Sequence, residues 1–269
     1  SNQGGFYSTF AYVSEARRMG LTVQPPDVRS SRIRWTGKGD MLQVGLMSIK
    51  DLSMRTMTRL VDEKNRRPFA NMDDFLYRVR PDETEGRALI HAGALDRLCP
   101  GSSRAMLLWD LARWKKVRAK EKRSPSLFGH DPLPAAPSLP PETEIDRLRR
   151  EFAALGFLCD RHPLTLYQSN LTGRRIVKAV HLSRYLNRQA TMAGWLITGK
   201  QVRTKYGDPM EFLTFEDDTG LVETTFFPEA YHRYCHIIDG GRPYLLTGKV
   251  EQDWGVCTLN VGKLVPLKR

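Results

Sequence analysis

The 269-residue chain has few cysteines and no long apolar run, and each absence excludes a class of protein. Its four cysteines, at positions 99, 159, 235 and 257, form no C-x-x-C pair, so we expect neither a zinc knuckle nor a disulfide scaffold, and a reducing cytosol fits. No apolar run approaches the roughly 20 residues that span a membrane, so no membrane partner is expected. The start at Ser1 has neither an initiator methionine nor an apolar signal core, which indicates a piece of a longer protein.

Catalytic and metal-binding signatures are also missing. There is no glycine-rich phosphate loop of the Walker type. A possible metal site has helical spacing but lacks a fourth ligand for tetrahedral zinc; it consists of His232, Cys235 and His236. An amphipathic helix with one solvent-exposed and one packed face explains this pattern. Asp217 and Asp218 are adjacent in a strand turn, where polar residues are expected anyway. We therefore predict no catalytic residue, no metal ligand and no cofactor in this chain.

Acidic residues are fewer than basic ones. Lysine and arginine number 42 against 30 aspartates and glutamates, a net charge of +12, which favours a polyanionic partner, most often nucleic acid. Two stretches are especially basic: 104–123 has eight basic and two acidic residues, and 174–205 has eight basic residues and no acidic one. Each is either a phosphate-binding surface or a solvated face.

The first half of the chain has the pattern of short helices joined by tight turns. Residues 6–19 have apolar side chains at helical spacing, and 21–26 should be extended because residues before proline avoid the helical region. Ser53 can cap a helix, another helix is predicted around 72–79, and Gly93 separates two helical stretches.

A long helix is predicted from Ser102 or Ser103 to the end of the first basic stretch. It is followed by six prolines within 124–143, a density that ends helices and central strands and indicates a stiff, extended linker. A further helix should begin near Glu142. Its apolar stripe consists of Ile145, Leu148, Phe152 and Leu155.

The last third of the chain changes to the alternation typical of strands. Five strands are predicted, at 195–202, 212–215, 221–227, 244–250 and 256–264, with a short helix at 228–237. A β-bulge is expected at Gly199. Three strands, a helix and two strands is the chain order of an oligonucleotide-binding (OB) barrel. The predicted fold class is therefore multidomain α+β, with an N-terminal all-α region and a C-terminal five-stranded OB-fold β-barrel.

The C-terminal segments carry a resemblance to a known family. Residues 205–210 (KYGDPM), 212–220 (FLTFEDDTG) and 227–231 (FPEAY) resemble the OB domain of the α subunit of bacterial DNA polymerase III, a C-family replicative polymerase. Residues 151–157 (EFAALGF) and 162–164 (HPL) resemble the segment that precedes that domain.

The N-terminal segments resemble the same family, in the same order along the chain. Residues 14–20 (SEARRMG) and 25–27 (PPD) resemble the end of the family's fingers region. Residues 89–96 (LIHAGALD) resemble the second hairpin of its tandem helix-hairpin-helix module. Together the matches cover nearly the whole chain.

The resemblance implies a division of the chain into parts. These are an end-of-fingers region at 1–40, a tandem helix-hairpin-helix DNA-binding module at 41–123, a proline-rich linker at 124–143, a helical connector at 144–190 and an OB domain at 191–269. The module would hold duplex product and the barrel single-stranded template, in replication or damage-tolerant synthesis. The parent would be a DNA-directed DNA polymerase of the bacterial cytoplasm, associated with the nucleoid and dependent on Mg. Its catalytic palm aspartates would lie outside this chain, which alone should not polymerise DNA.

The helix-hairpin-helix module is expected to bind phosphate with backbone amides at a glycine-bearing turn. The first hairpin departs from the family pattern, because Asp51 and Ser53 stand where glycines are usual and the aspartate would repel phosphate. The second keeps Gly93, with Asp96 close behind it. Expected duplex-backbone contacts are Lys50, Ser53, Ala92, Gly93, Ala94 and Arg104. Helix packing is the alternative role of both hairpins.

The barrel is the second expected nucleic-acid surface. Single strands bind where basic residues meet exposed aromatic platforms, and Tyr206 and Trp254 lie in two loops that line an OB groove. Strand alternation should bury Leu213 and Phe215 and leave Phe212 outward. Expected single-strand-binding residues are Lys200, Arg203, Lys205, Tyr206, Phe212, Thr214, Lys249 and Trp254. Burial in the core is the alternative for each aromatic residue.

Leu127 and Phe128 in the linker resemble the family's short sliding-clamp-binding peptide, although Ser124 stands where that peptide normally has glutamine. The sliding clamp and other replisome subunits are thus expected partners besides DNA. Two other functions stay open: a replisome protein-interaction module that binds no DNA, and a tRNA-binding OB module like those of class II synthetases. Affinity for single strands would argue against the first, and the preceding helical hairpins argue against the second.

Overall fold

The computed structural model describes residues 7–123, 142–253 and 255–268. They form two compact units: the helical unit, residues 20–160, and the barrel unit, which combines residues 1–19 with 161–269. Each unit has its own hydrophobic core, and each is described by itself below.

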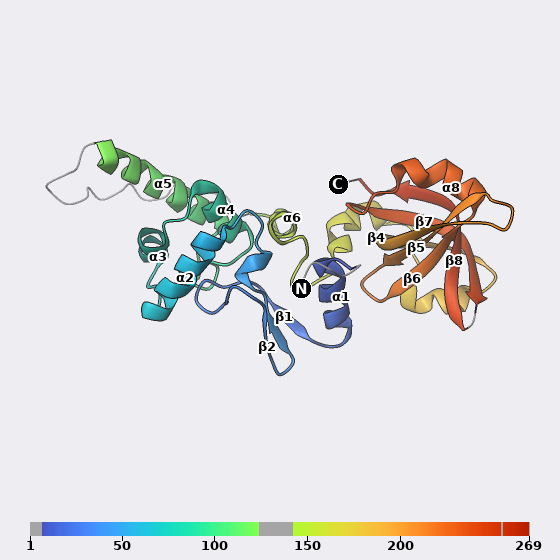
Figure 1. The fold of residues 1–269 in the computed structure, drawn as a ribbon, viewed down its shortest axis with the longest axis horizontal. Coiled ribbons are helices and arrows are strands. Elements are labelled where there is room, and N and C mark those ends of the chain that lie inside the picture. The colour runs from blue at the N-terminus through green and yellow to red at the C-terminus, as the bar shows by residue number, and fades with distance from the viewer. Residues whose placement is uncertain (1–6, 124–141, 254, 269) are drawn as a thin grey trace. The chain divides into compact units, whose positions relative to one another are not determined.

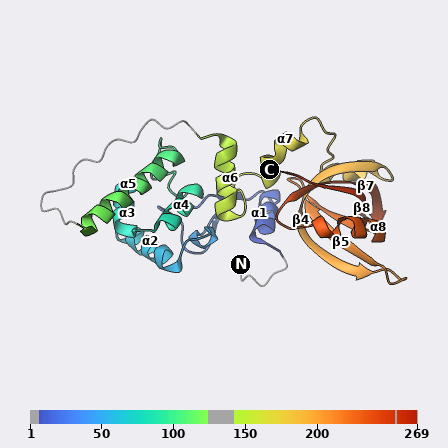
Figure 2. The same ribbon diagram turned by 90° about the horizontal axis from the view of Figure 1, so that it is seen from above.

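The helical unit contains five helices and a small sheet among its described residues (Figures 1 and 2). The helices are α2 (Met54–Arg66), α3 (Met72–Val79), α4 (Glu83–His91), α5 (Arg104–Arg123) and α6 (Glu144–Leu155). The predicted helix at 72–79 matches α3, and the helical stretches on both sides of Gly93 match α4 and α5. The linker at 124–141, with Leu127 and Phe128, lies outside the described residues.

Side-chain caps explain where these helices begin. The Ser53 hydroxyl accepts a hydrogen bond from the Thr56 amide at 3.2 Å, as the sequence predicted. Asn71 and Thr143 cap α3 and α6 in the same way, and Asp82 forms a capping box with Glu85 at α4. Of these caps, only Ser53 was predicted from the sequence.

The small sheet was not predicted. It consists of β1 (Thr22–Gln24), β2 (Thr36–Lys38) and β3 (Met41–Gln43) in the order β1-β3-β2, with a short 3₁₀ turn, η1 (Leu46–Ser48), after it. Only the extended segment that contains β1 was expected. Each strand has three residues, too few for an alternating pattern to be recognised.

The apolar stripe predicted for α6 was partly wrong. The structure buries Leu148 and Leu155 as expected, but Ile145 and Phe152 are only half-buried. The remaining buried positions belong to Ala154 and Glu151. The Glu151 carboxylate accepts a hydrogen bond from the Cys159 amide at 3.1 Å, so a charged residue occupies a place in the core.

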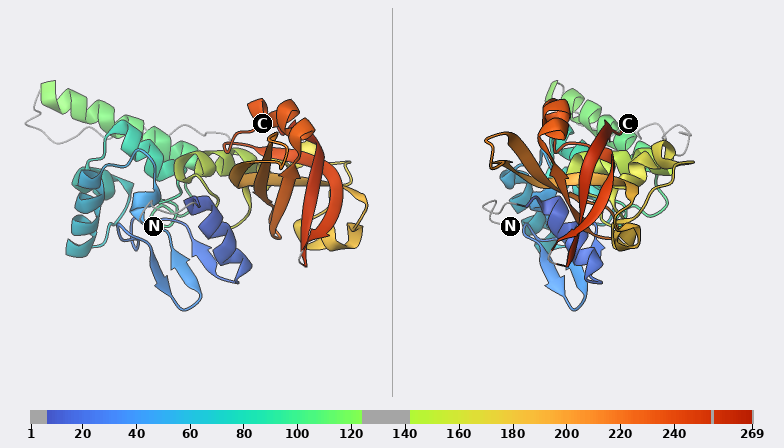
Figure 3. Two further views of the ribbon diagram at one scale, coloured as in Figure 1. Left: turned by 45° about the vertical axis from the view of Figure 1, so that its right-hand side comes forward. Right: turned by 90° about the vertical axis from the view of Figure 1, so that its right-hand side faces the viewer.

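The barrel unit is built on strands β4 (Gln189–Arg203), β5 (Pro209–Glu216), β6 (Leu221–Phe226), β7 (Pro243–Asp253) and β8 (Val256–Pro266). They close into a barrel in the order β4-β5-β6-β8-β7, with β6 and β8 parallel (Figures 1 and 3). The helix α8 (Pro228–Tyr234) lies between β6 and β7 in the chain. This is the OB topology, so the predicted fold class is confirmed.

Helices outside the strands complete the barrel unit. Helix α1 (Thr9–Arg18) begins after the Ser8 cap, later than the sequence pattern suggested. The short turns η2 (Pro163–Tyr167), α7 (Gln168–Leu171) and η3 (Ala179–Tyr185) precede the barrel, and η4 (Cys235–Ile237) extends α8. Val177 and Leu182 from this lead-in segment join the barrel core.

Strand alternation places the barrel core where the sequence predicted it. Leu213 and Phe215 are 2% and 0% exposed, whereas Phe212 between them is 46% exposed. Tyr244 is fully buried, and its hydroxyl donates to the backbone carbonyls of the loop that follows α8. The interior is therefore filled with side chains, and ligands can reach only the outer face and the loops.

The irregularity in β4 is two residues from the predicted position. The pairing of β4 with β5 shifts register between Leu196 and Thr198, not at Gly199. A Cβ atom at Gly199 would lie 2.3 Å from Cδ2 of Leu213, so this glycine leaves room for a core leucine. The bulge lies where β4 changes partner: it pairs with β7 up to Trp195 and with β5 from there on.

Candidate nucleic-acid interface

The outer face of the β4–β5 hairpin brings a cation and an aromatic ring together. Lys200 of β4 is the register partner of Phe212 of β5, and Thr198 is the partner of Thr214. Cross-strand partners on one face have their Cβ atoms about 5 Å apart. Both Lys200 and Phe212 are exposed. The hairpin therefore presents a flat ring beside an ammonium group, the combination that single-strand binding uses.

The tip of this hairpin adds a second pair. Tyr206 is 80% exposed, and Nζ of Lys205 lies 4.9 Å from the centre of its ring. The Thr204 hydroxyl accepts hydrogen bonds from the amides of Tyr206 and Asp208, each at 3.2 Å. The turn is thus fixed by Thr204, and it presents an aromatic side chain to solvent.

The row of paired residues that begins with Lys200 and Phe212 continues onto the next strands of the barrel, but there the lysine charge is neutralised. Phe212 pairs with Thr225, Thr225 with Asn260 and Asn260 with Lys249. Glu251 lies against both ends of the last pair: it accepts from Lys249 at 2.9 Å and from Asn260 at 2.6 Å. The hydrogen bond from Lys249 holds the pKa of this carboxyl below its ordinary value. Lys249 is therefore neutralised locally, unlike Lys200.

Arg203, another predicted barrel residue, lies apart from this face. Arg203 follows Lys200 on the opposite side of the strand, where its guanidinium donates to the Gly207 carbonyl at 3.0 Å. On that side Gln201 also bonds the hydroxyl of Tyr231 in α8. Trp254 lies outside the described residues.

The basic stretch at 174–205 does not form one continuous track. Arg184 and Arg188 come before β4, whereas Lys200 and Lys205 come at its far end, on a strand of 15 residues. Lys178 forms an ion pair with Asp218. The basic residues are contiguous in sequence, but β4 runs the length of the barrel between them. They therefore lie at its two ends.

In the first helix-hairpin-helix turn, the residues predicted to contact DNA make hydrogen bonds within the protein instead. The Lys50 amide donates to the Ala154 carbonyl at 2.9 Å, and its Nζ donates to the Ala153 carbonyl at 3.1 Å, at the C-terminus of α6. The Ser53 amide and hydroxyl both donate to Glu85. Asp51 has a φ of 61°, the left-handed conformation in which glycine is usual.

The residues of the second turn also make their hydrogen bonds and ion pairs within the protein. The amides of Ala92, Gly93 and Ala94 donate to carbonyls of α4 at 2.9–3.0 Å. Arg104 is 6% exposed and pairs with Asp96 at 2.8 Å. A Cβ atom on Gly93 would lie 2.4 Å from a guanidinium nitrogen of Arg104, so the glycine makes room for this arginine. The geometry favours a packing role for both hairpins over phosphate contact by these amides.

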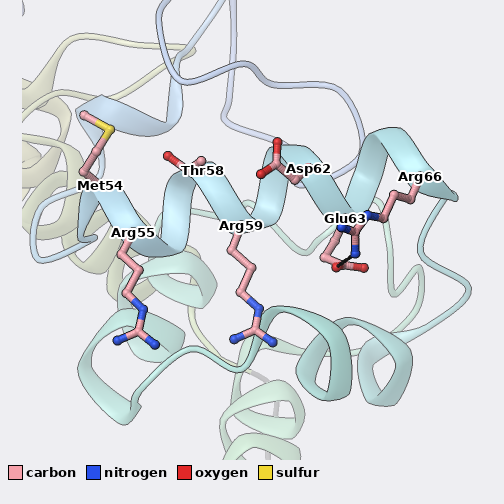
Figure 4. A pocket seen from close by; sticks show the side chains of 7 residues that line it. All are labelled: Met54, Arg55, Thr58, Arg59, Asp62, Glu63 and Arg66. Atoms are coloured by element: carbon pink, nitrogen blue, oxygen red, sulfur yellow. Dashed lines mark hydrogen bonds and ion pairs between the residues drawn. The ribbon is translucent and has the colours of Figure 1, made fainter.

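Sequence reasoning missed a hollow along α2. Arg55 and Arg59 extend from one side of the helix, and Met54, Thr58 and Asp62 extend from the other (Figure 4). Their spacing of four residues is the signal that the sequence carried. Glu63 at the far end is paired with Arg66 at 2.8 Å and with Arg78 at 3.1 Å.

The adjacent aspartates of the β5–β6 turn are structural. Asp217 is 1% exposed, and its carboxylate accepts hydrogen bonds from the Thr219 amide and hydroxyl, the Gly220 amide and the Ala179 amide. Turn chemistry therefore explains this carboxylate. Among residues 7–123, 142–253 and 255–268, no group of three or more histidine, cysteine, aspartate or glutamate side chains is placed to hold a metal ion.

Among the helices that the structure describes, none is both long enough and apolar enough to cross a membrane.

Comparisons with known proteins agree with these observations. A family model described as a helix-hairpin-helix motif matches residues 20–107. The DNA polymerase III subunit alpha of Bacillus subtilis is 29% identical over 251 residues, which cover 89% of this chain and 22% of that protein. The error-prone DNA polymerase of Aromatoleum aromaticum is 29% identical over 277 residues, covering 97% and 24%. The chain is homologous to a segment of the bacterial DNA polymerase III α subunit. The resemblance predicted from the sequence is confirmed.

The chain spans about a quarter of the length of these two relatives. Among solved structures, a domain of replication protein A from Methanococcus maripaludis is similar with a TM-score of 0.31 and 19% identity, covering 35% of this chain and 98% of that domain.

Three of the segments that carry the resemblance to polymerase III α meet at one place in the barrel unit. Arg18 of α1 and His162 before η2 both contact Glu216 at the end of β5. The ring of Phe10 lies 5.4 Å from that of His162 and 5.7 Å from that of Trp195. The similar residues around 14–20, 162–164 and 212–220 thus form one contact network that joins α1 to the barrel.

Proposed function

We propose that this chain is a DNA-binding region of a polymerase III α-like DNA polymerase, and that its barrel unit holds single-stranded template. One observation carries the proposal: Tyr206 and Phe212 are exposed on the same hairpin as Lys200 and Lys205. Exposed rings offer stacking platforms of about 1–3 kcal/mol per base, and the lysines release counterions from the backbone. The OB topology and the polymerase relatives support this reading.

The helical unit is proposed to hold duplex product. Its match to a helix-hairpin-helix family model and the basic residues of α2 and α5 support this role. Because the hairpin amides are used within the fold, side chains are the better candidates for duplex contacts.

We propose that the parent protein is a DNA-directed DNA polymerase that requires Mg²⁺. Two-metal nucleotidyl transfer needs clustered carboxylates, and we place these in parts of the polymerase outside this chain. The chain alone is expected to bind DNA without extending a primer.

The experiment is fluorescence anisotropy with a labelled single strand, a duplex and a primer-template across a salt series. The parent chain should bind the single strand with an affinity that falls steeply with salt. Tyr206→Ala/Phe212→Ala should weaken this binding, while Arg233→Ala, an exposed arginine paired with Glu229 on α8, should not. A parent chain that binds no nucleic acid at low salt would favour the replisome interaction module instead.

Sliding-clamp binding by Leu127 and Phe128 stays a separate proposal, because these residues lie outside the described ranges. A pull-down decides it. Clamp retained equally by the parent and by Leu127→Ala/Phe128→Ala would remove the peptide from the proposed function.

A further inference from the structure

The small sheet of the helical unit carries a polar hollow. It is lined by β1, β2, β3 and the loop between β1 and β2, with Gln24, Ser30, Arg32, Thr36, Lys38 and Gln43 among its residues. The register of the sheet places Thr36 opposite Gln43 and Lys38 opposite Met41. Three strands and a loop thus contribute side chains to one surface that the hairpins do not include.

The charge of this hollow has one sign. Its lining includes Arg32 and Lys38 and no carboxylate. Both cations are exposed, and neither forms an ion pair with another residue in the part of the chain that the structure describes. In the sequence, residues 28–39 contain four basic residues and no acidic one. The surface is therefore built to attract an anion.

A third cation lies next to the hollow. Nζ of Lys64, on α2, donates to the Ser31 carbonyl at 2.7 Å. Burial lowers the pKa of Lys64, and the nearby charge of Arg32 lowers it further. The nearby Asp27 carboxylate acts in the opposite direction and raises the pKa of Lys64.

The uncharged polar groups of the hollow are held in place. Nε2 of Gln43 donates to the Pro25 carbonyl at 2.5 Å. Oε1 of Gln24 accepts from the guanidinium of Arg97 at 3.0 Å. These internal hydrogen bonds fix the two glutamine side chains at the edge of the hollow, and they leave the contacts to an anion chiefly to its two cations.

The hollow along α2 is less suited to a polyanion. It contains Arg55, Arg59 and Arg66, but Asp62 and Glu63 line it as well (Figure 4). Arg66 is already paired with Glu63. The hollow on the sheet keeps two cations and has no acid.

We propose that the hollow on the β1-β3-β2 sheet binds the phosphodiester backbone of duplex DNA. Its lining supplies cations and hydrogen-bonding side chains but no aromatic ring, so it contacts phosphates and cannot stack bases. Binding is therefore independent of sequence, as a product duplex requires. The inference rests on the proposed DNA-binding function and assigns the duplex to a surface distinct from the hairpin amides.

The test compares Arg32→Ala/Lys38→Ala with the control Arg87→Ala/Arg149→Ala in the full chain. The control removes the same charge from the same unit, at exposed arginines paired with Glu83 and Asp146 on helices α4 and α6. Anisotropy is measured with a labelled duplex and a labelled single strand across a salt series. Each lost phosphate contact should reduce the duplex salt slope by about 1, so the test variant should lose about 2. The control should keep the parent slope, and neither variant should change single-strand affinity.

The outcomes separate this inference from the proposed function. Duplex binding by Arg32→Ala/Lys38→Ala with the parent slope overturns the inference and leaves the proposed function intact. Equal loss in the control variant overturns it too, because net charge alone would then explain the effect. A loss confined to the single strand also contradicts it. A parent chain that binds no nucleic acid removes both, and circular dichroism of each variant confirms that the fold is retained.

Discussion

Nε2 of His162 lies 3.2 Å from Oε1 of Glu216, and both side chains are buried in the barrel unit. The Leu164 amide donates to Nδ1 of the same ring at 3.2 Å, so Nδ1 is an acceptor and Nε2 carries the proton. Arg18 donates to the other carboxylate oxygen of Glu216 at 3.3 Å. A buried carboxylate is thus held by groups from two distant segments.

Arg18→Ala is expected to lower the free energy of unfolding of the barrel unit by about 3 kcal/mol, because it leaves the Glu216 carboxylate buried without its cation. Glu216→Gln should cost less, since the amide oxygen still accepts one of these two hydrogen bonds, Arg18 keeps its ion pair with Glu15, and no uncompensated buried charge remains. Urea unfolding followed by tryptophan fluorescence measures both. The reverse order of the two losses would show that the ion pair is not what stabilises this joint.

Glu85 is expected to make the helical unit sensitive to acid. Burial alone would raise the pKa of its carboxyl, but hydrogen bonds from Ser53, from the Asp82 amide and from Thr56 outweigh it and hold the pKa below its ordinary 4.5. A lowered pKa contributes stability that is complete above about pH 4.5 and is lost as the pH falls through the folded-state value.

Glu85→Gln should therefore cost about 1–2 kcal/mol at pH 7, since it keeps only part of these hydrogen bonds. Its unfolding free energy should then depend less on pH below 4.5 than that of the parent. Urea titrations at pH 7 and in the acid range give both values. Parallel pH profiles for parent and variant would rule out this role for the carboxylate.

Gly93→Ala should destabilise the helical unit more than Gly101→Ala. Both glycines have a left-handed φ, of 78° and 85°, so each substitution carries a conformational cost of about 1–2 kcal/mol. At Gly93 the new Cβ atom would also meet the Arg104 guanidinium, whereas at Gly101 nothing lies within 4 Å. The difference between the two unfolding free energies isolates the contact with Arg104, and equal losses would contradict it.

A salt titration should distinguish the contributions of charge and of stacking to single-strand binding by the barrel hairpin. Lys200→Ala and Lys205→Ala should each reduce the single-strand salt slope by about 0.7, because each removes one phosphate contact. Tyr206→Ala should weaken binding by about 1–3 kcal/mol and leave the slope unchanged. A tyrosine variant with an altered slope and unaltered affinity at low salt would contradict the stacking role.

Local signals made much of the fold predictable. Caps such as Ser53 and the alternation around Leu213 act between residues close in sequence, and the structure confirms them. The three-residue strands of the small sheet were missed because their pairing joins segments that carry no periodic pattern. The bulge was placed at Gly199 because a glycine in a strand suggests one, whereas this glycine makes room for Leu213, its register partner on the neighbouring strand β5.

The candidate site was predictable only in part. Tyr206 and Phe212 were singled out by loop position and strand alternation, which are local properties, and the structure exposes both. The hydrogen bonds of the first-turn amides within the protein could not be predicted, because their acceptors, Glu85 and Ala154, lie far along the chain. The hollow on the sheet was hidden for the same reason, since its cations come together only when the strands pair.

The barrel unit is assembled from two stretches of chain, with the helical unit as an insertion between them. Arg18 and Glu216 are 198 positions apart, so at ribosomal rates of about 5–20 residues per second α1 waits roughly 10–40 s for its partner. The helical unit is complete before then and can fold while α1 still exposes Phe10 and Val13 to solvent. The order of synthesis therefore makes the insertion the first part to mature, and the barrel, closed by the last strand made, the final one.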